Sequence, residues 1–162
     1  MKRLAILAVT ALLAAPAIAR DSLGVFDNWG AFRDPRLPRC YAIAAAEPAR
    51  GAQTFEPFAS VGSWPARGVR NQVHLRLSRN MKKNEPIRLL VGRERFTLVG
   101  GSGDAWAQDK AMDAAIVAAM RSAGAMRVSF IGKDGKRISD RYDLTGAATA
   151  IDAATVGCAR RR

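Results

Sequence analysis

The stretch that decides the fold is residues 104–158, which read DAWAQDKAMDAAIVAAMRSAGAMRVSFIGKDGKRISDRYDLTGAATAIDAATVGC. Asp109 is placed to cap a helix, because a carboxylate there accepts free backbone N–H groups and is favoured by the helix dipole. Apolar residues then recur at steps of three and four, which draws one helix face: Met112, Ala115, Ile116, Ala119, Met120 and Ala123. Gly124 is expected to end the helix in the left-handed backbone conformation that glycine adopts easily. The pattern predicts a main helix from about Lys110 to Ala123.

A β-hairpin is predicted after the main helix. Residues 126–131 alternate between apolar and polar side chains, which is the period of a strand with one buried side. The dipeptide Asp134-Gly135 favours a two-residue turn in which both residues have positive φ. In the return strand Asp140 lies on the same side as Ile138 and Tyr142, so the sequence leaves open which side of this strand is buried.

The N-terminus has the parts of a secretory signal peptide. The basic pair Lys2-Arg3 precedes an apolar run from Leu4 to Ala15, and Ala17-Ile18-Ala19 offers a small-residue cleavage site. A signal anchor or a buried helix is the alternative, but the run is shorter than the about 20 residues that span a bilayer. We therefore expect a signal peptide over residues 1–19 and a single domain over residues 20–162. The mature chain is expected to be periplasmic, or secreted or associated with the outer membrane, with no transmembrane segment.

The two cysteines, Cys40 and Cys158, predict a disulfide. An alanine-rich helix from Ala147 to Thr155, with Ile151 directed inward, is followed by Gly157, which is expected to release the chain into Cys158. An even pair of cysteines in an exported protein is typical of a disulfide, and two buried free thiols are the alternative. The bridge would close a long loop, for which chain entropy gives at most about 4–5 kcal/mol.

The rest of the chain predicts short antiparallel strands. Strands are expected near residues 40–46, 58–61, 73–78, 87–91 and 95–99, the last two as a hairpin. Residues 62–71 read as an exposed basic loop, and the glycines at 100, 101 and 103 as a flexible connector. The fold class expected is α+β: an antiparallel, β-sandwich-like sheet with one main helix and a short C-terminal helix.

The C-terminal half resembles the invasion-associated locus B family, small exported proteins of alphaproteobacteria. The resemblance is carried by Ala105-Trp106-Ala107-Gln108-Asp109 before the helix, by the helix from Ala114 to Met120, and by the segment DRYDLTG at residues 140–146 leading to a late cysteine. Many members have a further cysteine pair in the middle of the chain, and this sequence has none there, so the resemblance is to a divergent member. It implies no catalytic residue.

Catalytic chemistry has little support in the sequence. His74 is the only histidine, so a Ser-His-acid triad or a metal site is disfavoured, and His74 is expected at the surface. A carboxylate pair for acid–base catalysis would have to come from Asp104, Asp109, Asp113, Asp134, Asp140 and Asp143. Most of these suit caps, turns or salt bridges instead. We expect no catalytic residue, cofactor or metal, and keep an exported hydrolase with an unrecognised carboxylate site as the alternative.

The excess of positive charge is the feature of the sequence that indicates a function. The formal net charge is +12, and removing Lys2 and Arg3 leaves 24 basic against 14 acidic residues, or +10. The candidate anion-binding surface consists of Arg67, Arg70, Arg76, Arg79, Lys82 and Lys83, with Arg88, Arg93 and Arg95 close behind in sequence. Anionic lipid, lipopolysaccharide or an envelope protein would be the partners, whereas nucleic-acid binding would be adventitious in an exported protein. A dispersed charge that serves solubility is the alternative.

These observations predict an exported, non-enzymatic, envelope-associated protein that binds anionic envelope components through a basic surface. A small structural partner in an envelope complex is a further alternative, which would be marked by an exposed apolar patch.

Overall fold

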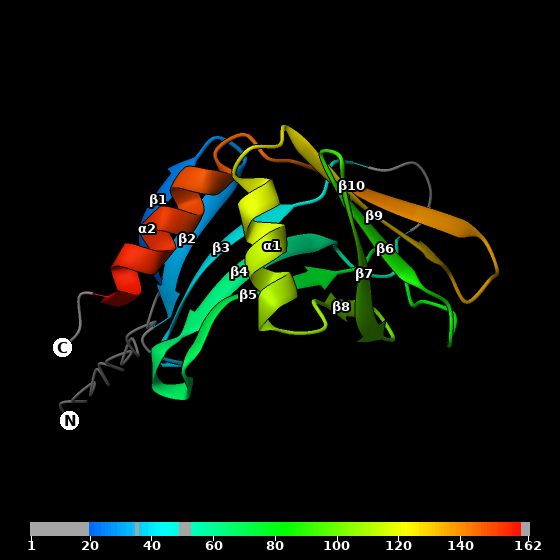
Figure 1. The fold of residues 1–162 in the computed structure, drawn as a ribbon, viewed down its shortest axis with the longest axis horizontal. Helices are drawn as coiled ribbons and strands as arrows, with labels where there is room; N and C mark the ends of the chain where they lie inside the picture. The colour runs from blue at the N-terminus through cyan, green and yellow to red at the C-terminus, as the bar shows by residue number, and fades with distance from the viewer. Residues whose placement is uncertain (1–19, 35, 49–52, 160–162) are drawn as a thin grey trace, which may run out of the picture.

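The computed structural model describes residues 20–34, 36–48 and 53–159. These residues form ten β-strands, two α-helices and one 3-10 turn (Figure 1). The strands are β1 (Asp21–Phe26), β2 (Trp29–Asp34), β3 (Arg39–Ala45), β4 (Phe58–Trp64), β5 (Val69–Arg76), β6 (Ile87–Val91), β7 (Glu94–Gly101), β8 (Asp104–Trp106), β9 (Ala125–Ile131) and β10 (Arg137–Asp143). The helices are α1 (Lys110–Met120) and α2 (Ala147–Ala159), and the 3-10 turn is η1 (Pro65–Arg67). The predicted signal peptide, residues 1–19, lies outside the described residues.

The ten strands make one antiparallel sheet in the order β1-β2-β3-β4-β5-β8-β7-β6-β9-β10. The α+β class is therefore confirmed, but the sandwich-like arrangement is wrong. The short strand β8 joins the two halves into one sheet, because it pairs with β5 on one side and with β7 on the other. The predicted flexible connector is the end of β7 and a tight turn. Gly100 permits the close approach, since a Cβ there would lie 2.2 Å from the Asp104 carbonyl oxygen.

Both helices lie on the same face of the sheet (Figure 1). On this helix-covered face α2 packs against β1 to β4, and α1 packs against β5 to β7. The buried side chains that point to it from the strands include Trp29, Ala42, Val61, Val73, Leu75, Leu89, Val128 and Tyr142. The alternate residues of the same strands form the opposite face, which we call the open face.

The predicted disulfide is present and ties α2 to the sheet. Cys40 lies in β3 and Cys158 in the last turn of α2, with Cα atoms 5.7 Å apart and a sequence separation of 118. The prediction that Gly157 ends the helix is wrong, because α2 continues to Ala159. Gly157 instead allows β1 to approach α2, since a Cβ there would lie 2.5 Å from a methyl carbon of Leu23.

Helix α1 begins as predicted and ends earlier. The Asp109 carboxylate caps it by accepting the Met112 N–H at 2.8 Å. The helix ends at Met120, and Gly124 does not take the left-handed conformation that was predicted for it.

The buried face of α1 includes five of the six predicted residues, all except Ala115, and extends further round the helix. Asp113 and Val117 are buried with Ile116, whereas Ala115 is exposed. The polar side chain of Asp113 is held on this face by a hydrogen bond of 2.8 Å, in which the Val73 N–H donates to its carboxylate. Burial raises the pKa of Asp113 above its ordinary value, partly offset by this bond.

The hairpin of β9 and β10 forms in the predicted place, and its buried side is now assigned. Asp140 and Tyr142 point inward, and Asp140 is 2% exposed. The Ser78 N–H donates to Asp140 Oδ2 at 2.9 Å, whereas Asp140 Oδ1 is buried without a hydrogen-bond partner. The predicted two-residue turn is wrong. Gly135 alone of the dipeptide has positive φ, and the turn runs from Gly132 to Lys136.

The predicted basic loop at residues 62–71 is largely ordered as strand. β4 continues to Trp64, η1 makes the turn, and β5 begins at Val69. Gly68 has a φ of 64° and ends η1, which allows the chain to reverse direction within a few residues. The arginines of this segment therefore project from the end of a β-hairpin.

Candidate functional site

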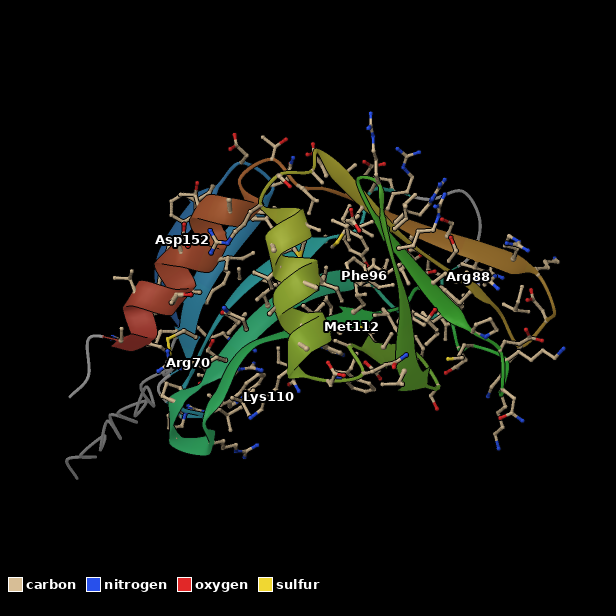
Figure 2. All side chains as sticks on the ribbon, viewed as in Figure 1. Arg70, Arg88, Phe96, Lys110, Met112 and Asp152 are labelled. Carbon is tan, nitrogen blue, oxygen red and sulfur yellow. A yellow bond between two sulfur atoms is a disulfide. The ribbon has the colours of Figure 1, made fainter. Side chains whose placement is uncertain are left out.

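The six basic residues that the sequence singled out do not gather in one place. Arg70 lies at the start of β5 and Arg76 at its end, so their Cα atoms are about 20 Å apart at the usual rise of a strand. Figure 2 shows Arg70 near one end of the molecule and Arg88 near the other. Arg67 lies in η1 beside Arg70, whereas Arg79, Lys82 and Lys83 follow β5 towards the β9–β10 turn, where Lys82 N–H bonds the Ile131 carbonyl.

Three of these six cations already have carboxylate partners. Arg76 pairs with Asp104 at 2.5 Å, Arg79 with Asp134 at 3.3 Å and Lys82 with Glu85 at 3.4 Å. A cation that is paired within the protein offers less charge to a ligand, because the local field is partly neutralised. The segment from residue 67 to residue 83 is therefore a weaker anion site than its composition indicates.

His74 is half-buried and held by neighbours, in contrast to its predicted surface position. Its Nε2 lies 2.9 Å from Asp104 Oδ1, and Arg76 bonds the other oxygen of the same carboxylate. The Arg76 guanidinium lies 3.7 Å from the centre of the Phe55 ring, a cation–π contact. The arrangement fixes three polar side chains on the open face of β5 and β8.

A row of side chains on the open face, which we call the apolar ridge, shares His74 with this cluster. It consists of His74, Trp106 and Val99, which are cross-strand partners on β5, β8 and β7. The His74 and Trp106 rings stack with centroids 5.1 Å apart and an interplanar angle of 17°. Trp106 is 36% exposed and Val99 is 48% exposed. The open face thus presents apolar surface to solvent beside charged side chains.

The open face of β6, β7, β9 and β10 carries a dense set of arginines. We call this set the arginine face: Arg88, Arg95, Arg127, Arg137 and Arg141. The strand register places the side chains in rows. One row runs across the strands through Arg95, Leu90, Arg127 and Arg141, and the next through Thr97, Arg88, Ser129 and Ser139. All five arginines are exposed.

Most of the arginine face lacks internal charge partners. Arg141 pairs with Glu47 at 3.5 Å, whereas no carboxylate of residues 20–34, 36–48 and 53–159 lies within ion-pair distance of the other four. Arg127 directly opposes Arg141 across the strands. Like charges in this position are unfavourable for folding. The face therefore keeps a positive field that the fold does not need.

Three shallow depressions lie between these guanidinium groups. The largest, with a volume of about 290 Å³, shares lining residues with each of the other two, and Glu85 also lines the smallest. Arg88, Ser129 and Arg137 line both the largest and the smallest depression. Arg127 lines the largest and the intermediate one. Guanidinium groups around a depression suit phosphate, because each can donate two parallel hydrogen bonds to its oxygens.

The six carboxylates considered for acid–base catalysis each have a separate partner. Asp104 accepts from His74 and Arg76, Asp109 from Met112, Asp113 from Val73, Asp134 from Lys136 and Arg79, Asp140 from Ser78, and Asp143 from Asn28 and Thr145. The Thr145 hydrogen bonds lower the pKa of Asp143, whereas burial raises that of Asp140. In the described part of the chain, no three His, Cys, Asp or Glu side chains are close enough to share a metal ion.

The sequence matches no protein-family model and no curated protein. The fold matches a solved structure, the crystal structure of invasion associated protein B from Bartonella henselae, with a TM-score of 0.57. This chain has the invasion associated protein B fold. The match covers 82% of this chain and 95% of the other, at 17% sequence identity. The predicted resemblance is thus confirmed at the level of the fold, with the low identity of a divergent relative.

Sequence reasoning overlooked part of the arginine face on this invasion associated protein B fold. Arg127, Arg137 and Arg141 alternate with inward residues in two strands that were correctly predicted. This alternation places all three arginines on the solvent side of their strands, and it could have been recognised in the sequence. Their convergence with Arg88 was hidden because β6 pairs with β9, a strand 34 positions or more away in sequence. None of the described helices is long and apolar enough to cross a membrane.

Proposed function

We propose that this protein is an exported, non-enzymatic protein of the bacterial envelope that binds phosphate-bearing envelope components through its arginine face. The observation that carries the proposal is the set of four exposed arginines, Arg88, Arg95, Arg127 and Arg137, on one open sheet face without a carboxylate partner among the described residues. The disulfide supports export, since such bonds are typical of oxidising compartments.

The chemistry of the face favours phosphate over a general cloud of anions. Arginine stays charged at all physiological pH values, and its planar group matches a phosphate in a two-point contact. A basic group next to an anionic lipid surface contributes about 1 kcal/mol of binding free energy. Four such groups on a rigid sheet need no ordering of loops, so little of that energy is lost on binding.

Vesicle binding tests the proposal. Phosphatidylcholine vesicles doped with phosphatidylglycerol should bind the protein, undoped vesicles should not, and the affinity should fall steeply with added salt. The double variant Arg88→Gln/Arg127→Gln should bind about 30-fold more weakly, from about 1 kcal/mol for each charge. The matched control is Arg67→Gln/Arg70→Gln, which removes the same charge at the opposite end of the molecule and should change the affinity much less.

Two results would contradict the proposal. Equal losses in the two double variants would mean that net charge, and not the arginine face, attracts the vesicles. Salt-insensitive binding would mean that charge contributes little.

Export is tested separately by the N-terminus of the protein isolated from cells. We expect the mature chain to begin at Arg20, after removal of residues 1–19. Recovery of the protein from the cytoplasm with Met1 intact would contradict the proposed location in the envelope, regardless of the result of the vesicle experiment.

A further inference from the structure

The apolar ridge and the arginine face are neighbouring parts of one continuous surface. Val99 and Thr97 lie on the same side of β7, and Thr97 is the cross-strand partner of Arg88. Val99 is in turn the partner of Trp106. With strands about 4.8 Å apart and alternate residues about 7 Å apart, the Cα atoms of Trp106 and Arg88 are about 12 Å from each other.

We infer that the open face docks onto the surface of a lipid bilayer, with phosphate groups on the arginine face and the apolar ridge reaching the boundary between headgroups and acyl chains. The inference rests on the proposed function and adds that the lipid is recognised through its apolar part as well as its phosphate. Trp106 is the central residue of the ridge, and tryptophan is the side chain that favours the membrane–water interface.

The exposure of the ridge argues for an apolar partner. Five large apolar side chains are exposed in the described chain: Val25, Leu37, Val99, Trp106 and Val156. Of these, Val99 and Trp106 are direct cross-strand partners and make a joint patch. Isolated exposed valines are ordinary, whereas a joint apolar patch bordered by cations has the composition of an interfacial membrane contact.

The geometry of the ridge disfavours a sugar or an acidic peptide as the partner. His74 covers one face of the Trp106 indole, and the separation of the two rings is close to the spacing between strands. The two rings therefore stack face to face on neighbouring strands, so a sugar cannot stack on the indole face that His74 covers. An acidic peptide would need only the arginines and would leave the ridge uncovered.

Quenching by brominated acyl chains tests where Trp106 lies. Vesicles of phosphatidylcholine and phosphatidylglycerol with bromine on their acyl chains should quench part of the tryptophan fluorescence of the wild-type protein. The part due to Trp106 should be lost in Trp106→Phe and kept in the control Trp64→Phe, whose ring packs over Gly62 on the same open face, while Trp29 is fully buried. Bound protein without quenching would overturn the inference while leaving phosphate binding intact.

A second measurement separates the ridge from the arginines. The ridge variant Val99→Thr/Trp106→Gln should bind the vesicles about 10-fold more weakly, through lost apolar contact, and should bind inorganic polyphosphate like the wild type. The arginine variant Arg88→Gln/Arg127→Gln should lose affinity for both. Val25→Thr, an exposed valine at the β1 edge, is the matched control and should change neither.

The outcomes are distinguishable. Wild-type vesicle binding by the ridge variant would overturn the inference and leave the proposed function standing. A parallel loss of polyphosphate binding in that variant would also overturn it, because the ridge would then act on the arginines. Wild-type binding of both ligands by the arginine variant would overturn the proposed function itself.

Discussion

The helix-covered face and the open face of the sheet both carry charged side chains, and they use them differently. On the helix-covered face Asp113 and Asp140 are buried, and each accepts a backbone N–H from β5 or from the residues just after it. On the open face Arg88, Arg127 and Arg137 are exposed and have no partner among the described carboxylates. The buried carboxyl groups support the fold as hydrogen-bond acceptors, whereas the exposed arginines leave their field available for another molecule. Mutations on the two faces should therefore separate stability from binding.

The largest effect is expected from the disulfide on the helix-covered face. Replacing both Cys40 and Cys158 by alanine should lower the free energy of unfolding by up to about 4–5 kcal/mol, because the bridge closes a loop of 118 positions in the unfolded chain. Urea unfolding of the variant and of the wild type, with and without reductant, measures the difference. Reductant should destabilise the wild type and leave the variant unchanged. A loss of phosphate binding in the variant under conditions where it remains folded would contradict the separation of the faces.

An intermediate effect is expected from the buried acid. Asp140→Ala should lower the free energy of unfolding by about 1–3 kcal/mol, because the Ser78 N–H loses its buried acceptor. Asp140→Asn keeps an acceptor and should cost less. Denaturant unfolding of the two variants against the wild type checks this order. An equal loss in both would mean that the charge, and not the acceptor, matters at this position.

The same acid predicts a pH dependence with a definite sign. Burial raises the pKa of Asp140 in the folded protein above that in the unfolded chain, so the folded state binds the proton more tightly. The stability of the wild type relative to Asp140→Asn should therefore rise as pH falls through the raised pKa towards the unfolded value near 4. Taking the difference between the two proteins cancels carboxylates such as Asp143, whose pKa is lowered and whose contribution has the opposite sign.

The smallest effect on stability is expected on the open face. Arg127→Gln removes the repulsion between Arg127 and Arg141, so the free energy of unfolding should stay within about 0.5 kcal/mol of the wild type or rise slightly. Binding to phosphatidylglycerol-containing vesicles should fall about 5-fold, from about 1 kcal/mol for the charge. A clear loss of stability would show that Arg127 supports the fold, and the contrast between the two faces would then fail at this residue.

Local patterns in the sequence predicted the elements well and their turns less well. Asp109 as a cap and residues 126–131 as a strand depend on near neighbours alone, and both are confirmed. Gly124 and Gly157 were taken as stops, but a glycine serves equally where another segment comes close, as Leu23 does at Gly157. The sequence shows the glycine and does not show which segment approaches it.

The sequence predicted a basic surface as the candidate site but assigned it to the wrong residues. The excess of positive charge is a property of composition, and basic residues concentrate in the sequence between Arg67 and Arg95, from which the run Arg67 to Lys83 was chosen. In the fold this run is spread along β5 and beyond, and Asp104, Asp134 and Glu85 partly neutralise it. Nearness along an extended strand is a poor guide to a shared surface, because six residues span about 20 Å.

The sequence by itself determined the element types, the excess of positive charge and the pair of cysteines, since these follow from local periodicity, composition and a simple count. Tertiary structure alone decided that the strands form one sheet instead of two, because a three-residue strand makes the connection. It also decided which arginines share a face. Pairing of β6 with β9 brings Arg88 and Arg127 together from different hairpins, and the register of this pair is set by burial of the opposite, helix-covered side. The arginine face is thus positioned by residues on the other side of the sheet.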